Sequence, residues 1–365
     1  MKLLYITNAI NGVGGLERVL SIKASYFAEV YHYDVTIVSL NQGNEKPFYE
    51  FSPKINLESI SVGGNPLQYI QNYRKGIQNI VFKIQPDVIL VCDDGLKGFT
   101  IPFLLNKKIP CIYERHVSKD IEWRDDFNSM QKWATRLKWK LMSFLGTKFD
   151  AFVVLTKGNL QEWEGLGNLQ VIPNPLTFYP EVSSDLKTKK VIAVGKQSYQ
   201  KGYDLLLKAW QKVHVLHPDW ELNIYGTKDA SQGLEKLALE LKIDPSIQFY
   251  EPVHNIQEKY LESSMFVLSS RYEGFGMVLI EAMACGVPCV SFNCPYGPSD
   301  IIQDQIDGVL VPNGDIHLLA DGMLQLIEND AARMLKGKLA KKNVENYKVE
   351  VIAMQWQQLF RSLRK

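Results

Sequence analysis

The 365-residue chain has few cysteines, no surplus of either charge and no long apolar run. Its five cysteines are odd in number and come without a recognisable export signal, so we expect reduced thiols. Forty-one Lys and Arg against 40 Asp and Glu give a net charge of +1, whereas a general nucleic-acid binder needs a basic surplus. No run approaches the ~20 apolar residues of a membrane span. These absences predict a cytoplasmic protein that does not bind nucleic acid.

Two similar halves follow one another along the chain. The length is about twice that of a typical domain, and 46% hydrophobic residues are ample for two cores. In each half, short apolar runs rich in β-branched residues alternate with stretches of helical apolar periodicity. Runs that are apolar on both faces are typical of parallel strands covered by helices on two sides. The pattern predicts an α/β fold with two Rossmann-like, doubly wound parallel sheets.

The expected boundaries come from composition. Ile172-Pro173-Asn174 is rigid, and the polar stretch that follows it is irregular. The expected strands are 3–7, 35–40, 88–92, 111–114 and 152–155 in the first half, and 191–194, 221–225, 247–250, 266–269, 288–292 and 308–311 in the second. We therefore expect a first domain at 1–173, a linker at 174–184, a second domain at 185–345 and an amphipathic helix at 346–365 that packs back across the domains.

A glycine-rich turn, with Gly14 and Gly15 at its end, follows the first expected strand and opens the first expected helix. Glycine lets the backbone approach a ligand closely, and amides at a helix N-terminus attract anions. A nicotinamide-dinucleotide fingerprint would need glycine at position 17, where Glu17 stands, and an acidic residue after the strand that Asp34 instead precedes. The turn predicts an anion site or a plain tight turn, and it disfavours a dehydrogenase.

The second half repeats this arrangement between Gly195 and Gly202. Lys196 and Lys201 can both reach one pyrophosphate, and they would neutralise the charge that grows when a diphosphate leaves. From residue types alone, a solvated loop with two lysines is an equal interpretation.

The segment 269–281 is the most informative part of the sequence. An expected strand ends there, a turn bracketed by glycines follows, and a helix begins near Met277. The amides of Phe275–Val278 would form a second anion site. Glu281, one turn into the helix, is placed to accept hydrogen bonds from a ribose-like diol, and Glu273 to contact the hydroxyls of a reacting sugar. A capping or surface carboxylate is the alternative for Glu281, although small apolar residues follow it.

Three cysteines, Cys285, Cys289 and Cys294, lie close together in the sequence and raise the question of a zinc site. The residues between the first two look like a helix-to-strand turn, and no histidine lies close by. We expect buried thiols and no metal.

Glu273 to Glu281 match the Glu-x7-Glu motif of the nucleotide-sugar glycosyltransferases of family four, which have the two-domain GT-B fold with a cleft between the domains. The segment 281–290 resembles the EAMA-x-G-x-P-V-V continuation of that motif. Further matches are Gly14-Gly15-x-Glu17-Arg18, Ile172-Pro173-Asn174, Gln200-Lys201-Gly202, 297–302 and 307–312. The chain is identified as a member of this family, of the bacterial surface-polysaccharide type.

The resemblance implies a donor site that binds a nucleoside diphosphate and its sugar. Its residues would be Gly14, Gly15, Lys196, Lys201, Phe275, Gly276, Met277 and Glu281. His116, which follows the expected strand 111–114, occupies the place of the family's histidine near the sugar, and with Lys201 and Glu273 it is an expected catalytic residue. Many members have arginine at the position of Lys196, so the bidentate contact that arginine offers is lost here.

The resemblance also implies the reaction. The family retains the anomeric configuration, and no second carboxylate is evidently placed as a nucleophile, unlike the paired acids of glycosidases. The nucleoside diphosphate, which we expect to be UDP, would leave on the front face without a metal, and no Asp-x-Asp motif is found to bind one. A hexose or N-acetylhexosamine would pass to a glycan or a lipid-linked oligosaccharide.

A basic, aromatic helix is expected between Phe127 and Phe149, a range without any acidic residue. One stripe holds Met130, Trp133, Leu137, Leu141 and Phe144, and the opposite side holds Lys132, Arg136, Trp139 and Lys140. The basic side with its tryptophan suits anionic headgroups at the inner face of the cell membrane, or the diphosphate of a lipid-linked acceptor. The alternative is a domain helix with its apolar stripe in the core and a solvated basic face.

Three other functions stay open. A nucleotide-sugar epimerase of the GT-B fold would share both domains but need no acceptor. A non-catalytic sugar-nucleotide sensor or assembly partner would keep its role without Glu273 or His116. A nicotinamide-dependent dehydrogenase is the remaining α/β option.

Overall fold

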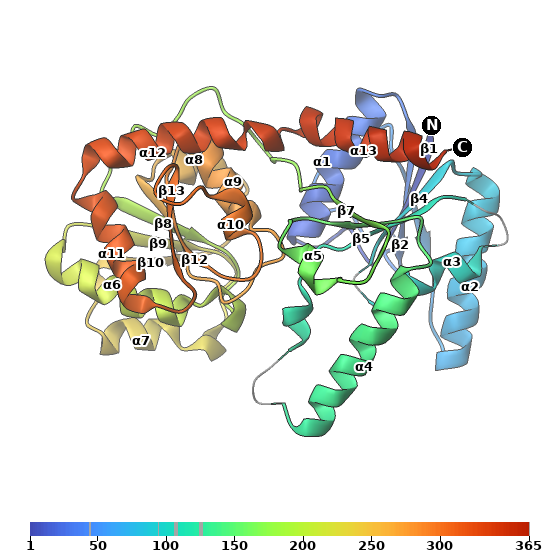
Figure 1. The fold of residues 1–365 in the computed structure, drawn as a ribbon, viewed down its shortest axis with the longest axis horizontal. Coiled ribbons are helices and arrows are strands. Elements are labelled where there is room, and N and C mark those ends of the chain that lie inside the picture. Colours follow the sequence, from blue (N-terminus) through green and yellow to red (C-terminus); the bar gives the residue numbers. More distant parts are fainter. Residues whose placement is uncertain (44, 94, 106–108, 124–126, 365) are drawn as a thin grey trace. The chain divides into compact units, whose positions relative to one another are not determined.

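The computed structural model describes residues 1–43, 45–93, 95–105, 109–123 and 127–364. The chain forms two compact units, one of Met1–Thr177 with Val349–Lys365 and one of Phe178–Lys348 (Figure 1). We call them unit 1 and unit 2. Unit 1 thus continues four residues beyond the expected end at 173, and the expected linker is shared between the units. The final helix returns to unit 1.

Unit 1 is built on one parallel sheet. Its strands are β1 (Lys2–Thr7), β2 (Asp34–Leu40), β3 (Asn56–Ile60), β4 (Val88–Cys92), β5 (Cys111–Glu114), β6 (Ala151–Val154) and β7 (Leu169–Val171). Their spatial order is β3-β2-β1-β4-β5-β6-β7, so the direction of winding reverses between β1 and β4. In an open α/β sheet, ligands bind at the carboxyl ends of the strands beside such a reversal.

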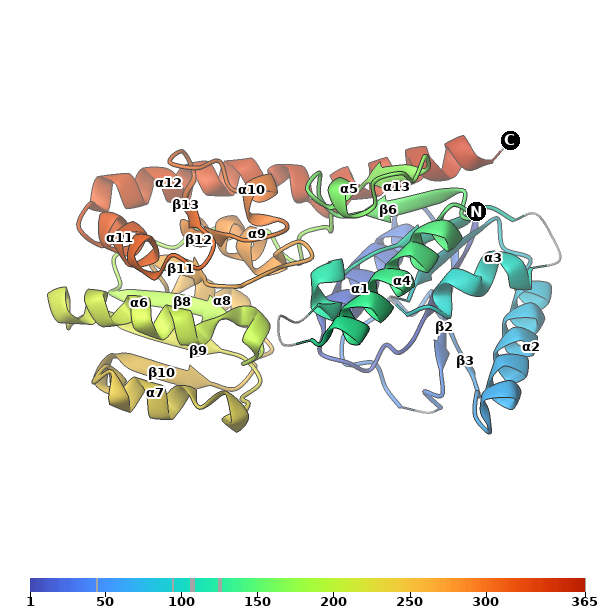
Figure 2. The same cartoon turned by 60° about the horizontal axis from the view of Figure 1, so that its bottom comes forward.

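Helices cover both faces of this sheet. One face packs against α1 (Gly15–Glu29) and α13 (Val349–Leu363), and the other against α2 (Pro66–Ile84), α3 (Ile101–Leu104), α4 (Ser129–Gly146) and α5 (Asn159–Glu162). Figure 2 shows α2 beside β3 at the edge of the sheet. The inward side chains are mostly Val, Ile, Leu and aromatic residues, which is why the central strands are apolar on both faces.

Unit 2 repeats the design with a shorter sheet. Its strands are β8 (Lys190–Val194), β9 (Glu221–Tyr225), β10 (Ile247–Tyr250), β11 (Met265–Leu268), β12 (Cys289–Asn293) and β13 (Gly308–Pro312), in the order β10-β9-β8-β11-β12-β13. One face packs against α6 (Tyr203–Leu216), α7 (Leu234–Glu240) and α11 (Ile316–Ile327). The remaining helices of this unit are α8 (Ile256–Leu261), α9 (Met277–Ala284), α10 (Pro298–Ile301) and α12 (Asp330–Asn343).

The predicted architecture of two Rossmann-like parallel sheets is confirmed. Two edge strands, β3 and β7, were not predicted from the sequence. Most residues of β3 are exposed or half-exposed, and β7 has only three residues, so neither shows the apolar run of a central strand.

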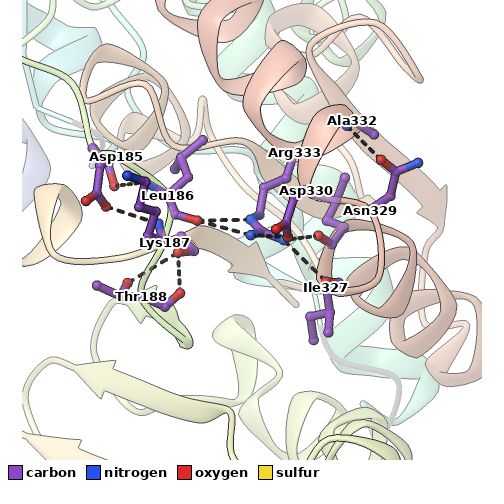
Figure 3. A network of polar contacts seen from close by, with 12 residues as sticks. Asp185, Leu186, Lys187, Thr188, Ile327, Asn329, Asp330, Ala332 and Arg333 are labelled. Carbon is purple, nitrogen blue, oxygen red and sulfur yellow. Dashed lines mark hydrogen bonds and ion pairs between the residues drawn. The ribbon is translucent and has the colours of Figure 1, made fainter.

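Arg333 of α12 is buried and fixes the backbone segment that precedes β8, the first strand of unit 2 (Figure 3). Its guanidinium donates to the Leu186 carbonyl from Nε and Nη2, at 3.2 and 3.1 Å, and to the Leu326 carbonyl at 2.6 Å. Asp330 balances its charge at 2.6 Å. Because Leu186 lies just before β8, this network fixes the strand that leads to the Lys196 loop.

We predict that Phe360→Ala lowers the free energy of unfolding of unit 1 by about 3–5 kcal/mol, the usual cost of emptying an aromatic site in a core. Phe360 is fully buried and lies 5.5 Å from Phe27 of α1, ring centroid to centroid. The measurement is urea unfolding.

Met354→Ala on the same helix is the control. Met354 is half exposed, so this substitution is expected to lower the free energy of unfolding by less than about 0.5 kcal/mol. Equal losses in the two variants would show that α13 does not close the core of unit 1.

Candidate donor and catalytic site

In unit 2, the expected catalytic pair lies side by side at the carboxyl edge of the sheet. Lys201 follows β8 in a short 3-10 turn, and Glu273 follows β11. Lys201 Nζ donates to Glu273 Oε1 at 2.8 Å, and the Ser270 hydroxyl donates to the same oxygen at 2.6 Å. Both charged side chains are largely enclosed, at 17% and 8% exposure. A lysine and a carboxylate thus meet where sequence reasoning expected a diphosphate and a sugar.

A second ion pair, which sequence reasoning missed, joins the two loops that carry this pair. Arg271 forms a bidentate contact with Asp204 at 2.9 and 2.8 Å, and donates to the Tyr199 carbonyl at 2.7 Å. Partial burial opposes ionisation of Asp204, yet Arg271 lowers its pKa. Arg271 lies inside the segment 269–281, but nothing in the sequence relates it to Asp204 of α6. This contact holds the Lys201 loop against the Glu273 loop.

Close backbone approach explains one glycine of the site. Gly202 adopts φ 60°, and a Cβ there would lie 2.1 Å from the Ser269 carbonyl oxygen. Only glycine therefore lets the turn after Lys201 pass this close to the end of β11. The Lys196 side of the same loop is tied by Gln197, whose backbone amide donates to the Thr227 carbonyl at 2.9 Å. Lys196 itself is exposed.

The expected anion site at the start of α9 is present as backbone geometry. Gly276 has φ 96° and precedes Met277, the first residue of the helix, with no side chain capping the helix. Phe275 is buried against Tyr347, with ring centroids 5.7 Å apart. Amides at such a helix start point along the helix dipole and favour an anion. The predicted phosphate contact of this turn stays a prediction.

Glu281 is a buried carboxylate with a defined partner, so the surface alternative is wrong. The side chain is 1% exposed, and the Tyr260 hydroxyl donates to Glu281 Oε2 at 3.4 Å. Its contact with a ribose remains a prediction.

In unit 1, the turn at Gly14 and Gly15 opens α1 at the carboxyl end of β1. Glu17 folds back over the turn, so that a Cβ at Gly14 would lie 2.6 Å from Glu17 Oε2. A Cβ at Gly15 would meet no atom within 4 Å. The described surroundings of Gly15 therefore leave space in which a ligand can approach the backbone.

His116 follows β5 and belongs to a buried charge network. Its Nε2 lies 3.3 Å from Glu114 Oε2, and the same carboxylate pairs with Lys23 of α1. Lys23 Nζ lies 4.3 Å from the ring centroid of Trp356 on α13, so the final helix covers this charge. Burial would raise the pKa of Glu114, but Lys23 and His116 outweigh it and hold that pKa at about 2. Sequence reasoning found His116 and missed both of its neighbours.

Cys92, Glu114 and His116 place ligand atoms within 4.8 Å of one another, a separation that suits a metal ion. The Glu114 carboxylate is already paired with Lys23, however, and a second cation beside it would be repelled. This charge balance does not favour a metal there. Cys285, Cys289 and Cys294 are buried free thiols, and burial raises the pKa of Cys285 to about 12. They do not belong to the group of close ligand atoms found among the described residues.

On α4, Arg136 and Lys140 are exposed as expected, whereas Trp139 and the apolar stripe lie elsewhere than expected. Trp139, expected on the exposed basic face, is half-buried and packs on the core of unit 1 and on Trp123, 5.7 Å between ring centroids. The apolar stripe from Met130 to Phe144 is exposed, so its placement in the core is wrong. The sequence pattern alone could not tell which side of α4 contacts the sheet.

Comparisons with known proteins identify relatives of this chain and structures with a similar fold. A family model described as "Glycosyl transferases group 1" matches residues 178–346. An uncharacterized glycosyltransferase of Haemophilus influenzae is 30% identical, with 97% of this chain and 98% of that protein covered. An amylovoran biosynthesis glycosyltransferase of Erwinia amylovora is 28% identical over similar coverage, 97% and 98%. The solved structure of a Staphylococcus aureus TarM variant with fondaparinux, alpha-GlcNAc-glycerol and UDP has a TM-score of 0.79 at 17% identity, and covers 98% of this chain and 99% of that one.

Two Rossmann-like units of this topology define a protein of the GT-B class. The chain belongs to the group 1 glycosyltransferases and is an enzyme, which confirms the resemblance to family four. Among the helices of the described residues, none combines the length and apolar character needed to cross a bilayer.

We predict that Glu114→Gln lowers the free energy of unfolding by about 3–5 kcal/mol, because it leaves the Lys23 ammonium buried without its counter-charge. Lys23→Met combined with Glu114→Gln removes both charges, so it is expected to cost less than the two single changes added together. Denaturant unfolding at pH 7 measures all three variants. Strict additivity would show that the pair does not act as one unit.

Proposed function

We propose that the protein is a retaining glycosyltransferase that moves a hexose or N-acetylhexosamine from a nucleoside-diphosphate sugar, with UDP as the nucleotide, to a glycan or lipid-linked acceptor in surface-polysaccharide synthesis. The observation that carries the proposal is the Lys201–Glu273 pair at the carboxyl edge of the unit 2 sheet. The family membership supplies the reaction class.

The donor site would use the charges and amides of two neighbouring loops. Lys201 and Lys196 would contact the diphosphate, the Phe275-Gly276-Met277 turn would receive its oxygens, and Glu281 would hold the ribose. The UDP named with the TarM structure supports UDP as the nucleotide. The Arg271–Asp204 contact would keep the two loops in register before the donor arrives.

The reaction would depend on charge balance at the leaving group. As the bond from sugar to diphosphate breaks, negative charge grows on the phosphate oxygens, and the lysines and the α9 amides would stabilise it. When a donor binds, Lys201 would exchange part of its contact with Glu273 for the diphosphate, which leaves Glu273 able to accept hydrogen bonds from the sugar hydroxyls. Because lysines and amides neutralise the diphosphate, no metal is required.

His116 would contact the transferred sugar, and Gly14 and Gly15 would let the backbone approach it. Glu114 lies beside His116 and would hold the ring in place, with Lys23 balancing the charge of that carboxylate. An ionised neighbour of this kind favours a ring nitrogen that donates a hydrogen bond to the carboxylate.

The amylovoran relative supports a place in polysaccharide synthesis, and the proposed location is the cytoplasm with peripheral contact at the inner face of the cell membrane. A nucleotide-sugar epimerase or a non-catalytic sugar-nucleotide partner is the competing function. An epimerase would convert donor without acceptor, and a partner would bind donor without turning it over.

We predict that UDP raises the melting temperature of the purified protein more than GDP, ADP or NAD does, because a ligand that binds only the folded state stabilises it by mass action. Lys201→Ala should remove most of the shift, and Lys236→Ala, an exposed lysine on α7, should leave it unchanged. Differential scanning fluorimetry measures all three proteins. A shift with NAD alone would favour a dehydrogenase instead.

We predict that Lys201→Ala lowers turnover by about 10²–10³, the typical cost of removing one electrostatic stabiliser of a leaving group. Lys201→Arg should recover part of the rate, because it restores the positive charge. Turnover is measured as UDP release from the UDP-sugar that gives the largest melting shift, with water as the acceptor of the sugar. Near-normal turnover in Lys201→Ala, with the native circular-dichroism spectrum, would refute the role of this lysine.

A further inference from the structure

Helix α4 of unit 1 presents its large apolar side chains outward. Met130, Trp133, Leu137, Leu141 and Phe144 recur at intervals of three and four residues and are 45–74% exposed. Residues at these intervals form one stripe along a helix. Large contiguous apolar patches on a protein surface mark a contact with a partner or a membrane.

The opposite side of α4 fastens the helix to unit 1. Met142 is fully buried, and Trp139 and Leu145 pack on the core. Near its N-terminal end, Lys132 and Arg136 lie 5.8 and 5.5 Å from the ring centroid of Trp123. Figure 1 shows α4 extending away from the sheet of unit 1, so the stripe is displayed on a projecting element that unit 1 itself anchors.

The charged residues of α4 itself are all positive. At 100° per residue, Lys138 lies on one flank of the stripe and Lys140 on the other, so Lys140 is nearer to the stripe than to the opposite side on which it was expected. No acidic residue occurs between Phe127 and Phe149. An apolar stripe between basic flanks is the pattern of a helix that lies in the headgroup region of a bilayer.

We propose that the exposed stripe of α4 binds an anionic membrane surface, with the five apolar side chains entering the headgroup and acyl boundary and the flanking cations contacting lipid phosphates. The positive flanks favour anionic lipid over a second copy of this chain, because two such stripes placed face to face would bring like charges together. The inference gives the peripheral location proposed above a specific surface. It does not depend on the donor chemistry of unit 2.

The test is co-sedimentation with vesicles of phosphatidylcholine alone and of phosphatidylcholine with phosphatidylglycerol, 3:1. The unchanged protein should bind the anionic vesicles, and Leu137→Ser with Phe144→Ser should lower the bound-to-free ratio at least about tenfold. The matched control is Leu67→Ser with Ile70→Ser, two residues of α2 in the same unit that are as exposed as the stripe, and it should bind normally. Lys140→Ser, at an exposed lysine, should weaken binding by roughly fivefold and lessen its salt dependence.

Tryptophan emission supplies a second measurement. Brominated anionic lipids should quench part of the fluorescence, and Trp133→Phe should remove that part. Equal binding to neutral and anionic vesicles, or equal loss in the α2 control, would overturn the proposal. So would self-association that disappears in the stripe variant while no form binds vesicles. The UDP-induced melting shift, measured on the same variants, reports on unit 2 separately, so a failure of the donor site would not be mistaken for a failure of the membrane surface.

Discussion

Parallel pairing of every strand is the constraint on which the rest of the molecule depends. Because the strands of each sheet run in one direction, all their carboxyl ends lie at one edge, and the loops that leave them are brought together there. In unit 2 this places the loops after β8 and β11 in contact, although about 70 residues separate Lys201 from Glu273. In unit 1 it places the turn after β1 and the residue that follows β5 at a common edge.

Ion pairs and hydrogen bonds of charged side chains then give these edges a defined geometry. A buried charge without a partner is costly, so each one restricts the arrangements that its neighbours can adopt. The Arg271–Asp204 pair holds the two loops of unit 2 together. Arg333 fixes the backbone before β8, and Lys23 fixes the carboxylate beside His116. None of these three contacts is a ligand contact. Each positions a residue for which a ligand contact is proposed.

The predictable part of the fold is the part with strong apolar patterning. The central strands were identified to within a residue or so at each end, and the helices α6 and α9 begin where periodicity and glycine placement indicated. The edge strands β3 and β7 were not predicted, because most residues of β3 are exposed and β7 is very short. The orientation of α4 was not predicted for a different reason. From the sequence, either its apolar side or its basic-aromatic side could pack on unit 1, and only the position of the core decides which side does.

The candidate site likewise has a part that the sequence predicts and a part that only the structure shows. The sequence by itself determined which residue types stand after which strands, namely the glycine turns, the two lysines, His116 and the carboxylates Glu273 and Glu281, because each follows a local pattern that can be read along the chain. Only the tertiary structure decided that Lys201 pairs with Glu273, that Arg271 binds Asp204, and that Lys23 lies beside Glu114. These partners are between 67 and 91 residues apart. Their meeting follows from the order of the strands in each sheet, and short-range periodicity carries no information about that order.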